Sequence, residues 1–229
     1  MSAIAIITAR GGSKRIPKKN IKNFCGKPII AYSIEAALKS KAFDVVMVST
    51  DSEEIAQVAR EYGAEVPFLR SAKTSDDFAT TEDVIKEVVD EYEKRSMSFD
   101  YVSCIYPTAP FITAERLNEA MTKLVESGAE SINPVVEYSF PPARSTVITE
   151  DGKLKFRWPE NTYKRSQDLE PWYHDAGQFY IYKKEAILGK TRLEWDEIPM
   201  ILSELEVQDI DNETDWKLAE LKYSLVHGE

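Results

Sequence analysis

A glycine-rich and strongly basic segment follows the first strand-like run of the chain. It spans residues 9–20 and reads Ala-Arg-Gly-Gly-Ser-Lys-Arg-Ile-Pro-Lys-Lys-Asn. Glycines let a backbone approach a ligand closely and direct successive N–H groups at it, while lysine and arginine supply positive charge. The segment therefore predicts a site for a triphosphate. A solvated basic turn before a helix is the alternative, although ligands of open α/β sheets do bind beyond the carboxyl ends of strands.

Charge is distributed unevenly along the chain. Seven cations precede the first acidic residue, Glu35, and removing those seven from the net charge of −10 leaves −17 for the remainder. This asymmetry indicates a local anion site on an acidic protein and argues against general binding to nucleic acid. The basic segment contains neither GxGxxG nor the GxxxxGK[ST] spacing. Neither a dinucleotide-binding fold nor a P-loop NTPase is therefore supported.

Two carboxylates one residue apart, Asp209 and Asp211, form a second candidate site. In an extended segment both side chains project to one side. There they can share a partly hydrated magnesium ion with nucleotide phosphates. The chain has 39 acidic residues, so such a pair also arises by chance, and Asp211 can instead be the N-cap of a final helix. The residues alone leave both interpretations open.

The elements that position these residues follow an alternating pattern. Short β-branched runs predict strands, and apolar positions at helical spacing between them predict amphipathic helices. This alternation is typical of an α/β domain with three layers, in which helices cover a mostly parallel sheet. A chain of 229 residues suits one such domain, residues 1–229. The predicted strands span residues 3–8, 45–49, 101–106, 131–137 and 178–182. The predicted helices contain residues 30–38, 55–62, 84–89 and 117–124, and Pro28 is expected in the first turn of the first of them. A last predicted helix, after Asp211, presents Trp216, Ala219, Tyr223 and Val226 on one face.

From about residue 138 to 173 the pattern changes to proline, aromatic and charged residues, with a predicted hairpin at residues 147–154. We interpret this segment as an insertion. Its aromatic residues are compatible with an interface or with a small core of their own.

Composition also predicts the compartment. No stretch approaches the roughly 20 apolar residues of a membrane span, and Arg10 follows the first apolar run, so we expect neither a membrane segment nor a signal peptide. The two cysteines, Cys25 and Cys104, lie in unrelated contexts. They favour a reducing cytoplasm over a disulfide framework or a zinc site.

Several blocks of the sequence, taken together, resemble the cytidylyltransferases that make CMP-activated acidic sugars. They occur in the family's order and span nearly the whole chain, so together they are specific where any one is weak. The blocks are residues 10–14, 17–20, 26–29, 48–51, 68–70, 106–110, 165–169 and 209–211. The resemblance implies a Rossmann-like nucleotidyltransferase fold. It also implies a homodimer in which residues 138–172 form a dimerisation insertion that reaches towards the partner's site.

The resemblance further implies the reaction and the roles of individual residues. The anomeric hydroxyl of an acidic sugar attacks the α-phosphorus of CTP, and the products are the CMP-sugar and pyrophosphate. The implied catalytic residues are Lys14, Lys19, Asp209 and Asp211, of which Asp209 and Asp211 bind Mg²⁺. The implied CTP-binding residues are Ala9, Arg10, Gly11, Gly12, Ser13, Asn20, Arg70, Thr80 and Thr81. The implied sugar-binding residues are Tyr106, Arg165, Asp175, Gln178 and Tyr180.

Two of these sugar-binding assignments have an alternative on the residues themselves. The guanidinium of Arg165 matches a planar carboxylate through two parallel hydrogen bonds. Exposed charge is nevertheless the usual state of an arginine, and Asp168 is close in sequence. Tyr180 shares a strand face with Gln178, yet it can equally belong to the core.

Three departures from the pattern of CMP-sialic acid synthetases bear on the sugar. Tyr106 stands where those enzymes usually have glutamine, Arg15 and Ile16 where Gly-Leu is commoner, and residues 175–177 where Asn-Gly-Ala is usual. These departures resemble pseudaminic acid cytidylyltransferases, so pseudaminic acid is the expected substrate.

Other functions remain open. The same chemistry can act on N-acetylneuraminic, legionaminic or 3-deoxy-manno-octulosonic acid. A glycosyltransferase that uses the D-x-D pair is disfavoured by the triphosphate-type loop. A noncatalytic nucleotide-binding protein is disfavoured because the loop and both carboxylates are present together.

Overall fold

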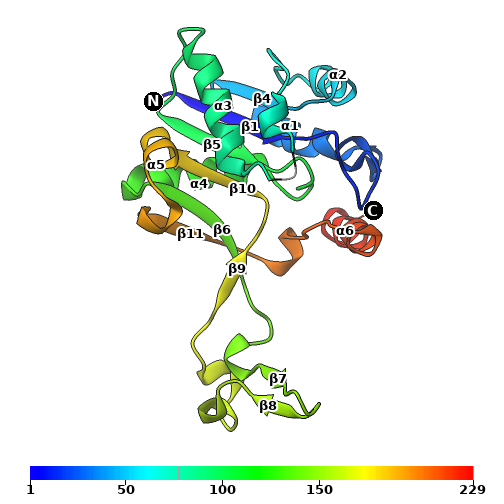
Figure 1. Cartoon of the computed structure of the whole chain (residues 1–229), viewed down its shortest axis with the longest axis vertical. Helices are drawn as coiled ribbons and strands as arrows, with labels where there is room; N and C mark the ends of the chain where they lie inside the picture. Colours follow the sequence, from blue (N-terminus) through cyan, green and yellow to red (C-terminus); the bar gives the residue numbers. More distant parts are fainter. Residues whose placement is uncertain (77, 229) are drawn as a thin grey trace.

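The computed structural model describes residues 1–76 and 78–228 and has a seven-stranded sheet at its centre (Figure 1). The strand order is β11-β6-β10-β5-β1-β4, and β9 pairs with β6. The strands of this sheet are β1 (Ala3–Thr8), β4 (Val45–Ser49), β5 (Tyr101–Ile105), β6 (Ser131–Glu137), β9 (Tyr173–Asp175), β10 (Phe179–Lys183) and β11 (Glu197–Leu202). All five predicted strands are present, two of them with ends that differ by one residue.

Most strands of the sheet point in one direction. β1 runs parallel to β4 and β5, and β6 runs parallel to β11. β10 is antiparallel to both β5 and β6, so those two share a direction, and β9 is antiparallel to β6. Only β9 and β10 therefore oppose the rest, which confirms a mostly parallel sheet. The carboxyl ends of β1, β4 and β5 consequently lie at one edge, where ligands of such sheets bind.

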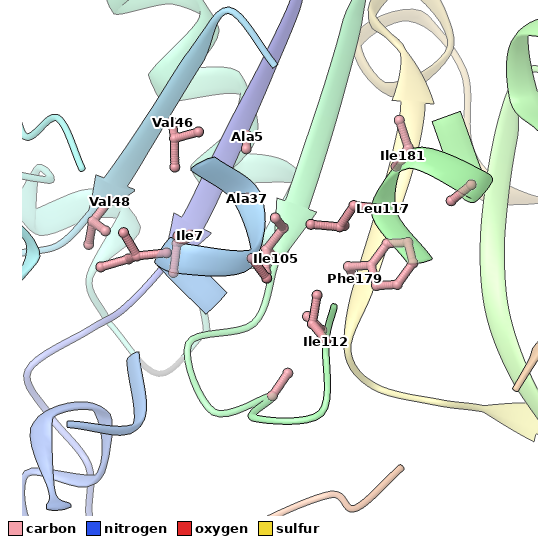
Figure 2. Close-up of a cluster of buried hydrophobic side chains, with 14 of the residues drawn as sticks. Ala5, Ile7, Ala37, Val46, Val48, Ile105, Ile112, Leu117, Phe179 and Ile181 are labelled. Atoms are coloured by element: carbon pink, nitrogen blue, oxygen red, sulfur yellow. The ribbon is translucent and has the colours of Figure 1, made fainter. Parts of the chain in front are cut away.

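Helices cover both faces of the sheet, which confirms the three layers. Alternate residues of β1 point to opposite faces. Ala5 and Ile7 pack with α1, α2 and α4 (Figure 2), whereas Ile4 and Ile6 pack with α3 and α5. The helices are α1 (Ile29–Ser40), α2 (Glu53–Glu61), α3 (Thr81–Glu93), α4 (Ala114–Ser127), α5 (Lys184–Gly189) and α6 (Glu213–His227). Pro28, expected in the first turn of α1, is instead its N-cap residue. Among the described residues, no helix combines the length and the apolar character needed to cross a membrane.

A third hydrophobic cluster attaches α6 to the start of the chain. Phe24 is fully buried and meets the rings of Tyr32, Trp216 and Tyr223 edge-on, with ring centroids 5.5–5.6 Å apart. Phe24 belongs to the short hairpin of β2 (Asn23–Phe24) and β3 (Lys27–Pro28). Trp216, Ala219 and Tyr223, three of the four residues predicted to share one face of α6, belong to this cluster, whereas Val226 in the last turn is 48% exposed. The cluster holds the segment before α6 against the basic loop.

Shortening Phe24 should therefore loosen α6. Phe24→Leu removes three edge-to-face contacts, each worth about 0.5–1.5 kcal/mol, so we expect the free energy of unfolding to fall by about 1.5–4.5 kcal/mol. Urea denaturation measures this change. Phe78→Leu is the matched control, because Phe78 is 91% exposed, and an equal loss there would contradict the assignment.

Residues 138–172 form an arm that projects from the sheet (Figure 1). The chain leaves through β6 and returns through β9, and these strands pair with each other. The predicted hairpin is present as β7 (Thr146–Ile148) and β8 (Leu154–Phe156), which are antiparallel. The rings of Trp158 and Trp172 meet 5.5 Å apart, whereas Phe140 and Tyr163 are 88% and 98% exposed. The arm thus has a small aromatic contact of its own and uncovered aromatic surface besides.

The remaining ordered segments are single 3₁₀ turns. They are η1 (Lys19–Ile21), η2 (Ala72–Thr74), η3 (Pro142–Arg144), η4 (Pro159–Asn161), η5 (Ser166–Asp168), η6 (Arg192–Glu194) and η7 (Glu204–Glu206).

Candidate functional site

A cavity of about 610 Å³ opens at the carboxyl ends of β1 and β5. Its lining comes from the basic loop, the start of α3, the segment after β5 and the segment before α6. The lining residues are Thr8, Arg10, Ser13, Lys14, Arg15, Ile16, Lys19, Asn20, Thr81, Tyr106, Pro107, Thr108 and Asp211. The fold thus brings the basic loop and one residue of the D-x-D pair, about 190 residues apart in sequence, onto one cavity.

The sequence-based candidates divide into two groups in the structure. Those that line the cavity are Arg10, Ser13, Lys14, Lys19, Asn20, Thr81, Tyr106 and Asp211. Those outside its lining are Ala9, Gly11, Gly12, Arg70, Thr80, Asp209, Arg165, Asp175, Gln178 and Tyr180. Lining residues to which the sequence analysis gave no individual role are Thr8, Arg15, Ile16, Pro107 and Thr108, of which Arg15 and Ile16 lie within the predicted triphosphate segment. Thr8 ends β1, and Pro107 and Thr108 closely follow β5, so their position after parallel strands was a usable signal.

Neighbouring side chains hold the basic loop in place. Asp51 accepts a hydrogen bond from the Gly11 amide at 2.7 Å, and the Asn20 amide donates to the Arg10 carbonyl at 2.9 Å. Asn20 is buried as well as lining the cavity. Ser52 rather than Asp51 caps α2, because its hydroxyl accepts from the Ile55 amide. Asp51 is therefore available to anchor the loop.

Gly11 has little room for a side chain. A Cβ there would lie 3.1 Å from Cβ of Ser52 and 3.5 Å from the Asp51 carboxylate. The loop or Ser52 would have to give by a few tenths of an ångström, and rates are sensitive to displacements of this order because a shift of about 1 Å can cost about 10²-fold. We expect Gly11→Ala to lower CTP affinity and kcat/KM about tenfold, measured by calorimetry and steady-state kinetics. At Gly12 a Cβ meets nothing within 4 Å, so Gly12→Ala should cost less, and equal losses would contradict this explanation.

Lys19 connects the basic loop to the D-x-D segment. Its ammonium group donates to the Ile210 carbonyl at 2.6 Å. Burial lowers the pKa of Lys19, and the negative charges of Asp211 and Asp209 oppose that shift. A cation held between the two carboxylates and the cavity is well placed to bind a phosphate oxygen as well.

The two carboxylates of the D-x-D pair face different surroundings. Asp211 lines the main cavity and pairs with Arg15 at 2.6 Å. Asp209 lines a second cavity of about 330 Å³, together with Asp175 and Lys222. The expectation that both project to one side of a shared site is therefore met only in part. Burial and the nearby charge of Asp211 raise the pKa of Asp209, so the pair carries an unfavourable concentration of negative charge.

This repulsion between the two carboxylates bears on whether a magnesium ion fits here. A divalent cation beside Asp209 and Asp211 would relieve it. Within the described residues, no three metal-ligating side chains form a group that could hold a metal ion. Magnesium in nucleotide sites commonly takes one or two carboxylates and completes its octahedron with phosphates and water. Asp211, which lines the main cavity, therefore fits a magnesium ion that arrives with a nucleotide, whereas Asp209 opens to the second cavity.

Arg70 and Thr80 support the cavity without lining it. Arg70 is buried and donates to the Ser49 hydroxyl at 3.1 Å and to the Ser49 carbonyl at 2.7 Å, which ties down the end of β4. Burial lowers its pKa. Thr80 is the N-cap of α3 and forms a capping box with Asp83. The residue that faces the cavity is Thr81, at the first turn of α3, where the helix dipole favours an anion.

The candidates for sugar recognition form a chain of contacts that begins at the cavity. The Tyr106 ring lies 5.7 Å from the Tyr180 ring, and the Tyr180 hydroxyl donates to Asp175 at 2.6 Å. Burial is the main cause of the raised pKa of Tyr180, so this phenol stays protonated as a donor. Gln178 is buried and its amide donates to the Glu206 carbonyl. Of these residues, Tyr106 lines the main cavity and can contact a ligand there, whereas the hydrogen bond of Gln178 to Glu206 stabilises η7.

Arg165 lies in the arm, at the N-cap of η5, and does not line the cavity of its own chain. Its side chain is 70% exposed, and the guanidinium donates two parallel hydrogen bonds to Asp168, at 2.7 and 2.8 Å. This is the geometry in which a guanidinium binds a planar carboxylate. Arg165 can therefore bind a carboxylate, as expected, but within one chain it does not lie at the main cavity.

Comparisons with known proteins show the family and the fold of the chain. The family model described as cytidylyltransferase matches residues 4–224. A pseudaminic acid cytidylyltransferase from Campylobacter jejuni is 38% identical over 229 residues, which cover 99% of this chain and 98% of that protein. A CMP-N,N'-diacetyllegionaminic acid synthase from Legionella pneumophila is also 38% identical, over 96% of this chain and 95% of that protein. A solved structure of a CMP:2-keto-3-deoxy-manno-octonic acid synthetase complexed with CTP superposes with a TM-score of 0.72, at 16% identity and full coverage of both chains, which shows the shared fold.

Proposed function

The chain belongs to the cytidylyltransferase family, and from that premise we propose that it transfers CMP from CTP to the anomeric hydroxyl of an acidic nine-carbon sugar and releases pyrophosphate. Pseudaminic acid is the proposed sugar, in line with the full-length similarity to the Campylobacter jejuni enzyme. The observation that carries the proposal is the cavity itself. It collects four cations of the basic loop opposite Asp211, an arrangement suited to a triphosphate and its counter-ion.

The chain's residues can align this reaction without a covalent intermediate. Arg10, Lys14 and Lys19 surround the triphosphate, and the start of α3 at Thr81 adds the positive end of a helix dipole. Charge neutralisation and alignment are the main requirements of nucleotidyl transfer. A magnesium ion on Asp209 and Asp211, when bound, would neutralise phosphate charge and lower the pKa of the attacking hydroxyl. No side-chain nucleophile is needed.

Recognition of the sugar is proposed to involve two chains. Tyr106 contacts the sugar from the cavity, with Tyr180 and Asp175 behind it. The arm, residues 138–172, reaches to the cavity of a second copy and presents Arg165 to the sugar carboxylate. The uncovered aromatic residues Phe140 and Tyr163 support such a homodimer. We place the enzyme in the cytoplasm, which its low cysteine content favours.

N,N'-diacetyllegionaminic acid is the second candidate sugar, because the Legionella pneumophila relative reaches the same 38% identity. The test incubates the protein with CTP and magnesium, adds each acidic sugar separately, and follows pyrophosphate release. We expect turnover with pseudaminic acid well above turnover with legionaminic, N-acetylneuraminic or 3-deoxy-manno-octulosonic acid. Preference for another sugar would keep the reaction and change the substrate. Absence of turnover across the panel, in protein that binds CTP, would overturn the proposed reaction.

A further inference from the structure

An ion pair inside the cavity joins the basic loop to the D-x-D pair. Nη2 of Arg15 lies 2.6 Å from Oδ1 of Asp211, across 196 positions of sequence, and both residues line the cavity. Asp211 is one of the two carboxylates that suit a metal ion. An arginine therefore pairs with a carboxylate that the proposed reaction needs for another cation.

The two partners of this ion pair differ in their freedom to move. The backbone at Asp211 is held from both sides, because Lys19 donates to the Ile210 carbonyl and the Asp211 amide donates to Asp215 at 2.9 Å. The Arg15 side chain is 66% exposed, against 42% for Asp211. Any exchange of partners therefore involves movement of the guanidinium rather than of the carboxylate.

A triphosphate in the cavity offers Arg15 a stronger partner. Guanidinium groups bind phosphate oxygens through parallel, charge-assisted hydrogen bonds. Arg15 lies between Lys14 and Lys19 in the sequence, and all three line the same cavity. An exposed single ion pair is weak, so Arg15 can pair with Asp211 when no nucleotide is bound and leave it when a triphosphate is bound.

We propose that Arg15 exchanges partners during the catalytic cycle. Without nucleotide it binds Asp211 and competes with divalent cations for that carboxylate; with CTP bound it moves to the triphosphate and releases Asp211 to the metal. Arg15 is then a positioning residue that makes nucleotide binding favour metal binding. This inference rests on the proposed function, and it adds that binding of CTP and binding of the divalent metal ion favour each other.

The test uses two binding measurements on the full chain and no turnover. Binding of Mn²⁺ to nucleotide-free protein is followed by electron paramagnetic resonance at low ionic strength, and binding of CTP is measured by calorimetry in EDTA. For Arg15→Ala we expect Mn²⁺ affinity to rise about two- to fivefold and CTP affinity to fall about tenfold or more. Arg15→Lys should change both less. Opposite changes exclude a merely structural role, because that would weaken both affinities.

Two further variants separate the exchange from a general effect of charge. Lys18→Ala removes a cation of the same loop that pairs with Glu54 at 2.7 Å and lies outside the cavity lining. It should leave Mn²⁺ affinity within error of the wild type. In an Asp211→Asn background, Arg15→Ala should no longer raise Mn²⁺ affinity.

The proposal is overturned if Arg15→Ala leaves Mn²⁺ affinity unchanged or lowers it, or if Lys18→Ala raises it equally. It is also overturned if the rise persists in the Asp211→Asn background. Failure of the proposed function would look different: the wild type would bind CTP and Mn²⁺ but release no pyrophosphate with any acidic sugar. The two failures can therefore be told apart.

Discussion

Replacing Asp211 with asparagine is expected to lower kcat/KM by about 10²- to 10³-fold, the usual cost of removing one preorganised electrostatic contact to a transition state. The amide keeps the size of the side chain and removes the charge that binds a metal ion. CTP binding measured in EDTA should be unchanged or tighter, because a negative charge leaves a cavity lined by four cations. Steady-state kinetics at saturating and limiting magnesium, together with calorimetry, measure both effects.

Glu213→Gln is the matched control for this prediction. Glu213 lies two residues along the chain, pairs with Lys22 at 2.8 Å and does not line the cavity. It should keep nearly full activity. If Asp211→Asn retained activity within a fewfold of the wild type, Asp211 would be no more than a partner of Arg15, and the metal site would have to be sought elsewhere.

Much of the fold was predictable because its signals are local. A strand buried on both faces reads as a run of β-branched residues, as residues 3–8 and 45–49 do, and such strands alternate with helices of period 3.6. The basic loop was predictable for a related reason, since its glycines and cations are consecutive. The position of β10 was found, but its antiparallel direction was not, because strand direction depends on pairing that a single segment does not encode.

The partners of individual site residues were not predictable. Arg70 belongs to a block that resembles the family's nucleotide site, yet its guanidinium is used to hold Ser49. Gln178 shares a strand pattern with Tyr180 but donates to Glu206 instead of facing a ligand. Arg15 meets Asp211 across nearly the whole chain. These choices depend on tertiary distances, whereas residue type specifies only which hydrogen bonds are possible.

Arg165 can act at the cavity of its own chain or at that of a partner chain, and subunit complementation decides between the two. We expect Arg165→Ala to lower kcat/KM for the sugar by about 10²-fold, the cost of leaving a carboxylate without its charged partner. Asp211→Asn is expected to be nearly inactive as well. If Arg165 acts on the partner's cavity, mixing the two variants under conditions of subunit exchange creates one intact site in each mixed dimer. Random pairing in a two-fold dimer then restores about a quarter of wild-type activity.

The same mixture of variants also tests the alternative that Arg165 acts at the cavity of its own chain. If Arg165 served the cavity of its own chain, every cavity in a mixed dimer would lack either Arg165 or Asp211, and no activity would return. Lys164→Ala is the control in the arm, because it removes the adjacent cation and keeps Arg165 in its pair with Asp168; alone it should remain active. Recovery would mean that the arm of one chain completes the active site of the other. No recovery, in a mixture shown to contain mixed dimers, would assign Arg165 to the cavity of its own chain, and full activity of Arg165→Ala alone would leave Arg165 only its surface ion pair with Asp168.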